Sequence, residues 1–249
     1  MSTLFTGISE LRTVSERGTL NDAALVAESG TISWIGPASE APAADEKVDL
    51  GGRAVLPGWV DSHTHMVFDG DRSAEFEARI SGGSYEAGGI AVTMDATRQA
   101  GTDRLDKLVA DRVAAGRRGG TTTFETKTGY GLNTESEVEA AKVASRHVDD
   151  VTFLGAHLVP PGADAEDYLD EVVGPMLEGV APYVQWIDVF CERGAFNEEQ
   201  SRRVLEAGKK LGLGLRVHGN QLGEGPGVAL AVELGAASVD HVNHLSDED

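Results

Sequence analysis

The chain has 249 residues, of which 41% are apolar and 25% are charged, fractions typical of a globular protein. Its 21 Lys and Arg against 41 Asp and Glu give a formal net charge of −20, and a field of this sign repels phosphate backbones and anionic lipid headgroups. We therefore expect neither nucleic acid nor a membrane surface as a partner. The amino terminus lacks the pattern of a signal peptide, and the single Cys191 excludes an intrachain disulfide, so we expect a cytoplasmic protein.

The first 56 residues predict short strands separated by Gly, Pro, Asp and Asn, which is a pattern typical of hairpins. The predicted strands cover residues 23–26, 31–35 and 47–50. This part of the chain contains no long helical period, so we expect a small β region here.

From residue 54 onward, apolar runs alternate with segments of helical period. The predicted strands cover residues 54–60, 121–125, 151–156, 186–191, 214–217 and 238–240. Between them, residues 103–116 and 197–211 place apolar side chains on one stripe, and Asn197 followed by Gln200 predicts a capping box. Apolar strands joined by helices indicate a covered parallel sheet and favour a (β/α) barrel over an open sheet.

The first of these predicted strands leads into His63 and His65, which are spaced i, i+2. Alternate side chains of an extended chain share one face, so both imidazoles can point to one centre, and imidazole is a common ligand for Zn or Fe. His218 follows another predicted strand, at the end where barrel enzymes carry the active site. Three histidine ligands leave an open position for water, as in a catalytic metal site. The alternative is that these are ordinary polar residues at strand ends.

His157 and His241 close two further predicted strands, so five of the seven histidines follow strands. A bound divalent cation lowers the pKa of water to ~7, so this convergence favours hydrolysis. His244 either belongs to the same site or is solvated. Cys191 is expected to be a small core residue, since nothing nearby predicts a lowered thiol pKa.

The sequence resembles the amidohydrolase superfamily and, within it, more closely the imidazolonepropionase family, along essentially its whole length. The general features are the amino-terminal β region and the segment PGWVDSHTH at residues 57–65. The more specific matches are residues 67–72, 75–76, 125–132, 152–157 and 188–192.

This resemblance implies a metal-dependent hydrolase with a TIM-like (β/α) barrel. Residues 1–56 would form part of a small β-sandwich domain, and residues 57–249 would supply the first six strands of the barrel. The family's barrel has eight strands, so we expect a longer protein, with the aspartate ligand that the family takes from its last strand lying outside the chain. The implied reaction is hydrolytic opening of the ring of 4-imidazolone-5-propanoate to N-formimidoyl-L-glutamate, in histidine degradation.

The resemblance also implies one metal ion, Zn or Fe, and a homodimer. The implied metal ligands are His63, His65 and His218, and the implied substrate contacts are Arg72, Tyr130 and His157, with Tyr85 as a weaker candidate. Arg72 can bind the propionate carboxylate through two parallel hydrogen bonds. Its alternative role is a surface pair with Glu75 or Glu77.

One residue departs from the family pattern. Where many members have a glutamate, the chain has Gln221, whose amide can contact substrate but cannot act as a general base. We expect Gln221 to belong to the catalytic and substrate-binding set, and proton transfer to fall to His241 or to a residue outside the chain.

Two other functions remain open, because a fold does not determine a substrate. One is another amidohydrolase reaction, by a heterocycle deaminase or a cyclic amidase. The other is a catalytically inactive binding module of the same fold, which Gln221 would fit.

Overall fold

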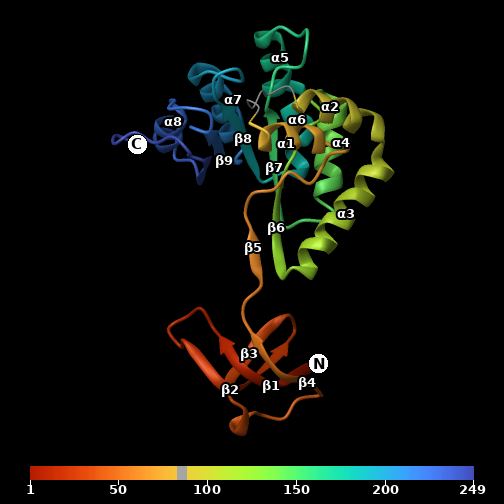
Figure 1. Cartoon of the computed structure of the whole chain (residues 1–249), viewed down its shortest axis with the longest axis vertical. Coiled ribbons are helices and arrows are strands. Elements are labelled where there is room, and N and C mark those ends of the chain that lie inside the picture. The colour runs from red at the N-terminus through yellow and green to blue at the C-terminus, as the bar shows by residue number, and fades with distance from the viewer. Residues whose placement is uncertain (83–88) are drawn as a thin grey trace. The chain divides into compact units, whose positions relative to one another are not determined.

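The computed structural model describes residues 1–82 and 89–249, and it divides into two compact units, Met1–Trp59 and Val60–Asp249 (Figure 1). The candidate Tyr85 lies outside the described residues, and so does the side chain of Glu75.

The first unit is a four-stranded sheet in the order β3-β2-β1-β4. Its strands are β1 (Ser2–Arg12), β2 (Thr19–Glu28), β3 (Thr31–Pro37) and β4 (Glu46–Val55), and a short 3-10 turn covers Ala38–Glu40. Strand β1 pairs antiparallel with β2 and parallel with β4. Ala23 and Leu25 pack on one face of the sheet, whereas Ala24 and Val26 pack on the other, so β2 is buried on both sides.

Strand β1 is absent from the sequence prediction. Its register against β2 shifts between Phe5 and Ile8, and Gly7 within this irregularity has a φ of +65°. The extra residue breaks the alternation of apolar and polar side chains by which a strand is recognised.

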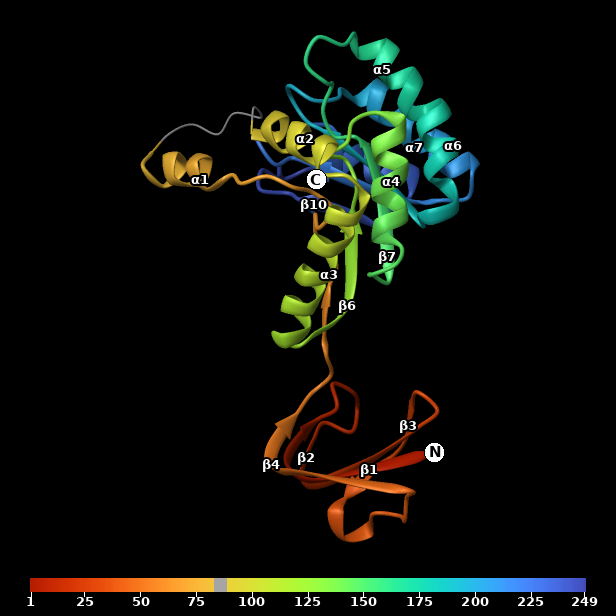
Figure 2. The ribbon, with the colours of Figure 1, turned by 90° about the vertical axis from the view of Figure 1, so that its right-hand side faces the viewer.

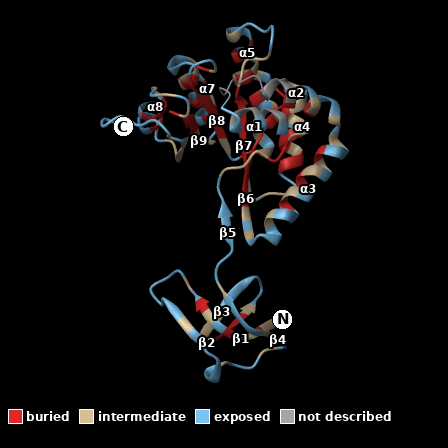
Figure 3. Cartoon of the chain, in the orientation of Figure 1, coloured by how far each residue is buried: buried red, intermediate tan, exposed pale blue. Residues whose placement is uncertain are grey.

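The second unit contains a six-stranded sheet in the order β10-β9-β8-β7-β6-β5. Its strands are β5 (Trp59–Asp61), β6 (Thr121–Lys127), β7 (Asp150–Ala156), β8 (Trp186–Cys191), β9 (Gly214–Gly219) and β10 (Ser238–His241). The pairs from β6 to β10 are parallel. Figure 3 shows that buried residues concentrate in the central strands, where the apolar runs of the sequence lie.

Helices alternate with the strands, and several of them pack against the sheet (Figures 1 and 2). They are α1 (Ser73–Ile80), α2 (Gly89–Ala100), α3 (Thr102–Arg118), α4 (Thr134–Ala144), α5 (Ala165–Glu171), α6 (Leu177–Val180), α7 (Glu198–Lys210) and α8 (Gly227–Leu234), with a π-helical turn at Val172–Met176 and a 3-10 turn at Ala181–Tyr183. Helix α7 begins with the predicted capping box between Asn197 and Gln200. Within the described residues, no helix combines the length and the apolar character needed to cross a lipid bilayer.

The strand order distinguishes a barrel from an open sheet. In a doubly wound sheet the order reverses at a switch point, whereas here every strand lies beside its predecessor in sequence. Right-handed crossovers that always advance in one direction place all helices on one side, which is the arrangement of a (β/α) barrel. The second unit is therefore an incomplete barrel of six strands.

One predicted strand is wrong. Residues 54–60 do not form a single element, because Ala54 and Val55 end β4 and the next strand, β5, begins only at Trp59. Pro57 lies between the two, and a proline has no N–H to donate to a strand ladder.

Candidate active site

The segment that carries His63 and His65 is fixed to strand β6. Thr64, between the two histidines, donates from its backbone N–H to Glu125 at 3.1 Å, and its backbone carbonyl accepts from the N–H of Lys127 at 2.9 Å. The extended segment turns both imidazoles to one side, where their Nε2 atoms lie 3.3 Å apart. The i, i+2 spacing thus brings the two rings together.

His218 completes a cluster of three imidazoles. It lies on β9, and its ring centroid is 4.7 Å from that of His63 and 5.6 Å from that of His65. One ring nitrogen from each histidine lies within 4.8 Å of the others. Such a group can hold a metal ion and leave a coordination position open.

One nitrogen of this cluster supports that interpretation. Nε2 of His218 is buried and has no hydrogen-bond partner among the described residues. Buried polar atoms are normally satisfied, so an orphaned imidazole nitrogen needs an explanation, and a metal ion supplies one. The residues present therefore fit a metal site.

The electrostatic environment keeps several imidazoles neutral. Burial lowers the pKa of His65 well below its usual value, and the neighbouring His157 and His218 lower it further. Burial also lowers the pKa of His157 to about 4. The pKa of His241 is lowered to about 4, by desolvation and by the rings of His218 and His63. A neutral imidazole is the form that binds metals and hydrogen-bonds through one free lone pair.

Tyr130 and His157 line the same site. The rings of His157 and His65 stack at 5.7 Å, and Tyr130 lies edge-on to His157 at 5.3 Å. Nδ1 of His157 lies 2.9 Å from the carbonyl oxygen of Gly129, so Nδ1 carries the proton and Nε2 is free to accept. Arg72 is half-buried just before α1, and its charge is among those that act on His157, after burial.

A buried carboxylate holds the loop that carries Tyr130. Glu137, on α4, accepts hydrogen bonds from the backbone N–H groups of Gly129, Gly131 and Leu132 at 2.9, 2.7 and 2.9 Å. Gly129 has a φ of +106°, which a residue with a side chain rarely adopts. Glu137 therefore fixes a loop conformation that the backbone does not favour by itself.

His241, which ends β10, lies beside the cluster. The His241 ring lies 5.3 Å from His63 and 5.0 Å from His218, and its backbone has a φ of +77°. Gln221 follows β9, and its backbone N–H donates to the carboxylate of Glu192 at 2.9 Å. His244 donates from its backbone N–H to Asn220, while the residue itself is exposed.

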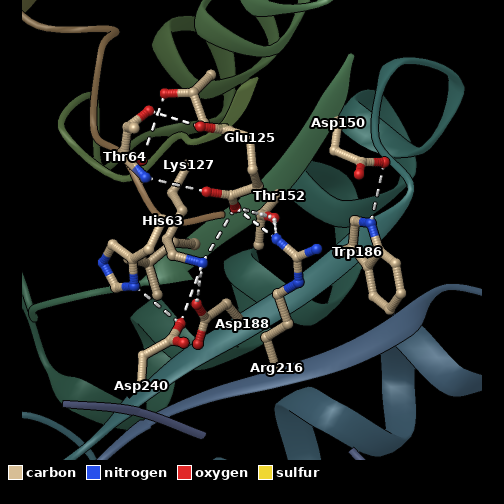
Figure 4. Close-up of polar contacts among 12 residues, drawn as sticks. His63, Thr64, Glu125, Lys127, Asp150, Thr152, Trp186, Asp188, Arg216 and Asp240 are labelled. Atoms are coloured by element: carbon tan, nitrogen blue, oxygen red, sulfur yellow. Dashed lines mark hydrogen bonds and ion pairs between the residues drawn. The ribbon is translucent and has the colours of Figure 1, made fainter. Parts of the chain in front are cut away.

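Beneath the imidazoles lies a network of buried charges (Figure 4). One oxygen of Glu125 accepts from Lys127 and Thr152 at 3.0 and 2.5 Å, and it forms an ion pair with Arg216 at 2.8 Å. Lys127 also lies 3.1 Å from Asp188. Burial alone would raise the pKa of Asp188, but His218 and Lys127 hold it well below its usual value, so the carboxylate is charged.

The amino-acid sequence is similar to those of known proteins. The chain is 66% identical to the imidazolonepropionase of Arthrobacter sp. (strain FB24) over 250 residues, and 64% identical to that of Saccharopolyspora erythraea over 249. Both matches cover all of the chain, with 62% and 64% of the relatives. The chain is similar to imidazolonepropionases throughout its length. A comparison with models of protein families gave no match.

The chain spans about three fifths of the length of the imidazolonepropionases that it matches. Among solved structures, A. niger ochratoxinase superposes with a TM-score of 0.65 at 18% identity, covering 99% of this chain and 61% of the other. An amidohydrolase superposes with a TM-score of 0.65 at 16% identity, covering 100% and 62%. At these identities the likeness shows a shared fold alone.

Glu137 and the network residues Lys127, Asp188 and Arg216 have no role in the sequence analysis. Two of these four, Lys127 and Asp188, lie inside segments quoted for the likeness to imidazolonepropionases. Glu125 and Lys127 are spaced i, i+2 in an otherwise uncharged strand, and this spacing predicts two charges on one face. Asp188 likewise stands alone within an apolar strand. Glu137 gives no such signal, because a glutamate near the start of a helix is common.

Proposed function

We propose that the whole protein hydrolyses the imidazolone ring C–N bond of 4-imidazolone-5-propanoate to give N-formimidoyl-L-glutamate, as a step of histidine degradation. The observation that carries this proposal is the cluster of His63, His65 and His218, in which Nε2 of His218 is buried without a hydrogen-bond partner, in a chain 66% identical to an imidazolonepropionase.

The three histidines would hold one metal ion, Zn or Fe, because imidazole suits both. Such an ion, when bound, activates water and polarises a carbonyl. A second group of candidate ligands is Asp188, His218 and Asp240, and its two carboxylates contact the ammonium of Lys127. That ammonium already supplies a cation to these carboxylates, which supports a single metal ion.

The other side chains would bind and orient the substrate. Arg72 would receive the propionate through two parallel hydrogen bonds. His157, with its Nδ1 proton held by Gly129, would accept a ring N–H at Nε2, while the Tyr130 hydroxyl would contact the ring beside it. Gln221 would donate and accept at the ring, and His241, whose ring lies against His63 and His218, would move the proton.

The test is an absorbance assay of imidazolone-propanoate consumption by the whole protein, with bound metal counted by elemental analysis. We expect one metal ion per chain and turnover that stops when a chelator removes the ion and returns when it is restored. Metal binding without turnover on this substrate would overturn the proposal. Such a result would favour an amidohydrolase that acts on another heterocycle. If no heterocycle reacts, it would favour the catalytically inactive binding module, which the presence of Gln221 would fit.

We further propose a homodimer that binds a small molecule, which the likeness to imidazolonepropionases supports. The net charge of −20 argues against nucleic acid as a partner, and the single Cys191 fits the reducing cytoplasm. Residues 1–56 would belong to a small β-sandwich domain, and residues 57–249 would supply the first six strands of the barrel.

A further inference from the structure

The ammonium of Lys127 is fully buried and surrounded by three carboxylates from three strands. Nζ lies 3.0 Å from Glu125 on β6, 3.1 Å from Asp188 on β8 and 3.3 Å from Asp240 on β10. The contact with Glu125 is a hydrogen bond, and the contacts with the two aspartates are ion pairs (Figure 4). Burying a charge costs a great deal of free energy unless it is paired in this way.

Two of these carboxylates contact candidate metal ligands through the same oxygen that faces Lys127. Oδ2 of Asp188 lies 2.9 Å from Nδ1 of His218, and Oδ2 of Asp240 lies 3.0 Å from Nδ1 of His63. A carboxylate at Nδ1 holds the proton there and leaves the lone pair of Nε2 for a metal. Each aspartate therefore orients one histidine, and a single ammonium contacts both aspartates.

We propose that Lys127 is a positioning residue of the metal site, whose ammonium holds Asp188 and Asp240 where they orient His218 and His63. This inference rests on the metal site of the proposed function. Ligand atoms of the two aspartates lie within 4.8 Å of one another, so two negative charges would repel without a cation between them. Without Lys127, the two carboxylates move apart, and this movement releases a histidine from its orientation.

A neighbouring residue gives the network its second cation. Arg216 lies 2.8 Å from Glu125, and its guanidinium stacks at 4.3 Å over the ring of Trp186. Glu125 is thus neutralised by Arg216 as well as by Lys127, whereas Asp240 has Lys127 as its only lysine or arginine partner among the ion pairs of the described residues. The effect of removing Lys127 is therefore expected at the aspartates rather than at Glu125.

The test is the zinc affinity of the whole protein and its Lys127→Met variant, measured by competition with a chromophoric chelator. We expect the variant to bind zinc roughly 10- to 100-fold more weakly, the range usual for partners of metal ligands. Substitution with cobalt(II) gives a second readout, because the visible absorption of cobalt reports ligand geometry and is expected to change. The control is Lys107→Met, since Lys107 is an exposed lysine paired with Asp111.

The outcomes separate this inference from the proposed function. A folded Lys127→Met protein with wild-type zinc affinity and cobalt spectrum overturns the positioning role, even if the wild type binds metal and turns over substrate. A wild type that binds no metal overturns the metal site and the inference with it. If Lys127→Met does not fold, Asp240→Asn tests the same relay, because Asp240 is partly exposed. This variant is expected to weaken zinc binding, and unchanged affinity would contradict the proposal.

Discussion

Asp188 contacts His218 twice across the neighbouring strands β8 and β9. One carboxylate oxygen accepts from the backbone N–H of His218 at 3.2 Å, and the other lies 2.9 Å from its ring Nδ1. The side chain thus fixes both the position and the orientation of the imidazole. The two contacts require that both oxygens of the side chain accept, and the amide of an asparagine has only one oxygen.

Asp188→Asn is therefore expected to lower metal affinity by roughly 10- to 100-fold. The amide nitrogen would face either the backbone N–H or Nδ1, and the second case would favour the wrong tautomer. Zinc competition with a chelator measures the change. The control, Asp170→Asn, alters an exposed partner of Arg203 and should bind zinc as the wild type does. Equal affinity of both variants would show that the contact does not orient His218.

Arg72→Ala is expected to raise KM for the propionate-bearing substrate by roughly 10- to 100-fold, since hydrogen bonds to charged groups contribute about 1.5–3 kcal/mol. Steady-state kinetics on the whole protein measure this, with the exposed Arg117→Ala as the control. An equal rise in KM for an imidazolone that lacks the carboxylate would contradict the assignment of Arg72 to the propionate.

Glu137→Gln is expected to lower the free energy of unfolding by about 1.5–3 kcal/mol, because the amide places a donor against at least one backbone N–H of the Tyr130 loop. Urea unfolding of the whole protein measures the loss. Glu135→Gln, on the exposed side of the same helix, should change stability little. If the two variants unfold alike, the loop does not depend on the Glu137 carboxylate.

Cys191 is expected to resist thiol reagents in the native protein. The residue is 1% exposed, and burial raises the pKa of its thiol, so little thiolate exists at pH 8. Labelling with an alkylating reagent, followed by mass analysis of the peptide that contains Cys191, should show modification only after urea unfolds the protein. Rapid labelling without denaturant would contradict this burial and reopen a chemical role for the thiol.

The barrel and its histidines could be anticipated because their signals are local. Apolar runs predict strands, and polar residues that follow them predict an edge where side chains converge. The consecutive order of the strands is not local, since it depends on which strands pair, and the periodicity of a buried strand is the same in a barrel and in an open sheet.

The buried charges are harder to anticipate for a different reason. Lys127 and Arg216, considered one at a time, are ordinary candidates for a solvated surface. Only the alignment of β6 with β7, β8 and β9 places them beside Glu125 and Asp188. The sequence contains the partners, but the pairing that makes their burial acceptable is a property of the assembled sheet.

That pairing also constrains how β6 can enter the sheet. Phe124 lies toward α3, where it packs beside Gly116, while Glu125 and Lys127 face the charged network. A slip of one residue would turn both charges toward the helix layer and bring Phe124 against the carboxylates. A strand with only apolar side chains tolerates such a slip more easily, because each apolar side chain can pack in the place of the next. In this barrel, the ion pairs of Glu125 and Lys127 form in only one register. The buried charges next to the histidines therefore select the correct alignment of the strands.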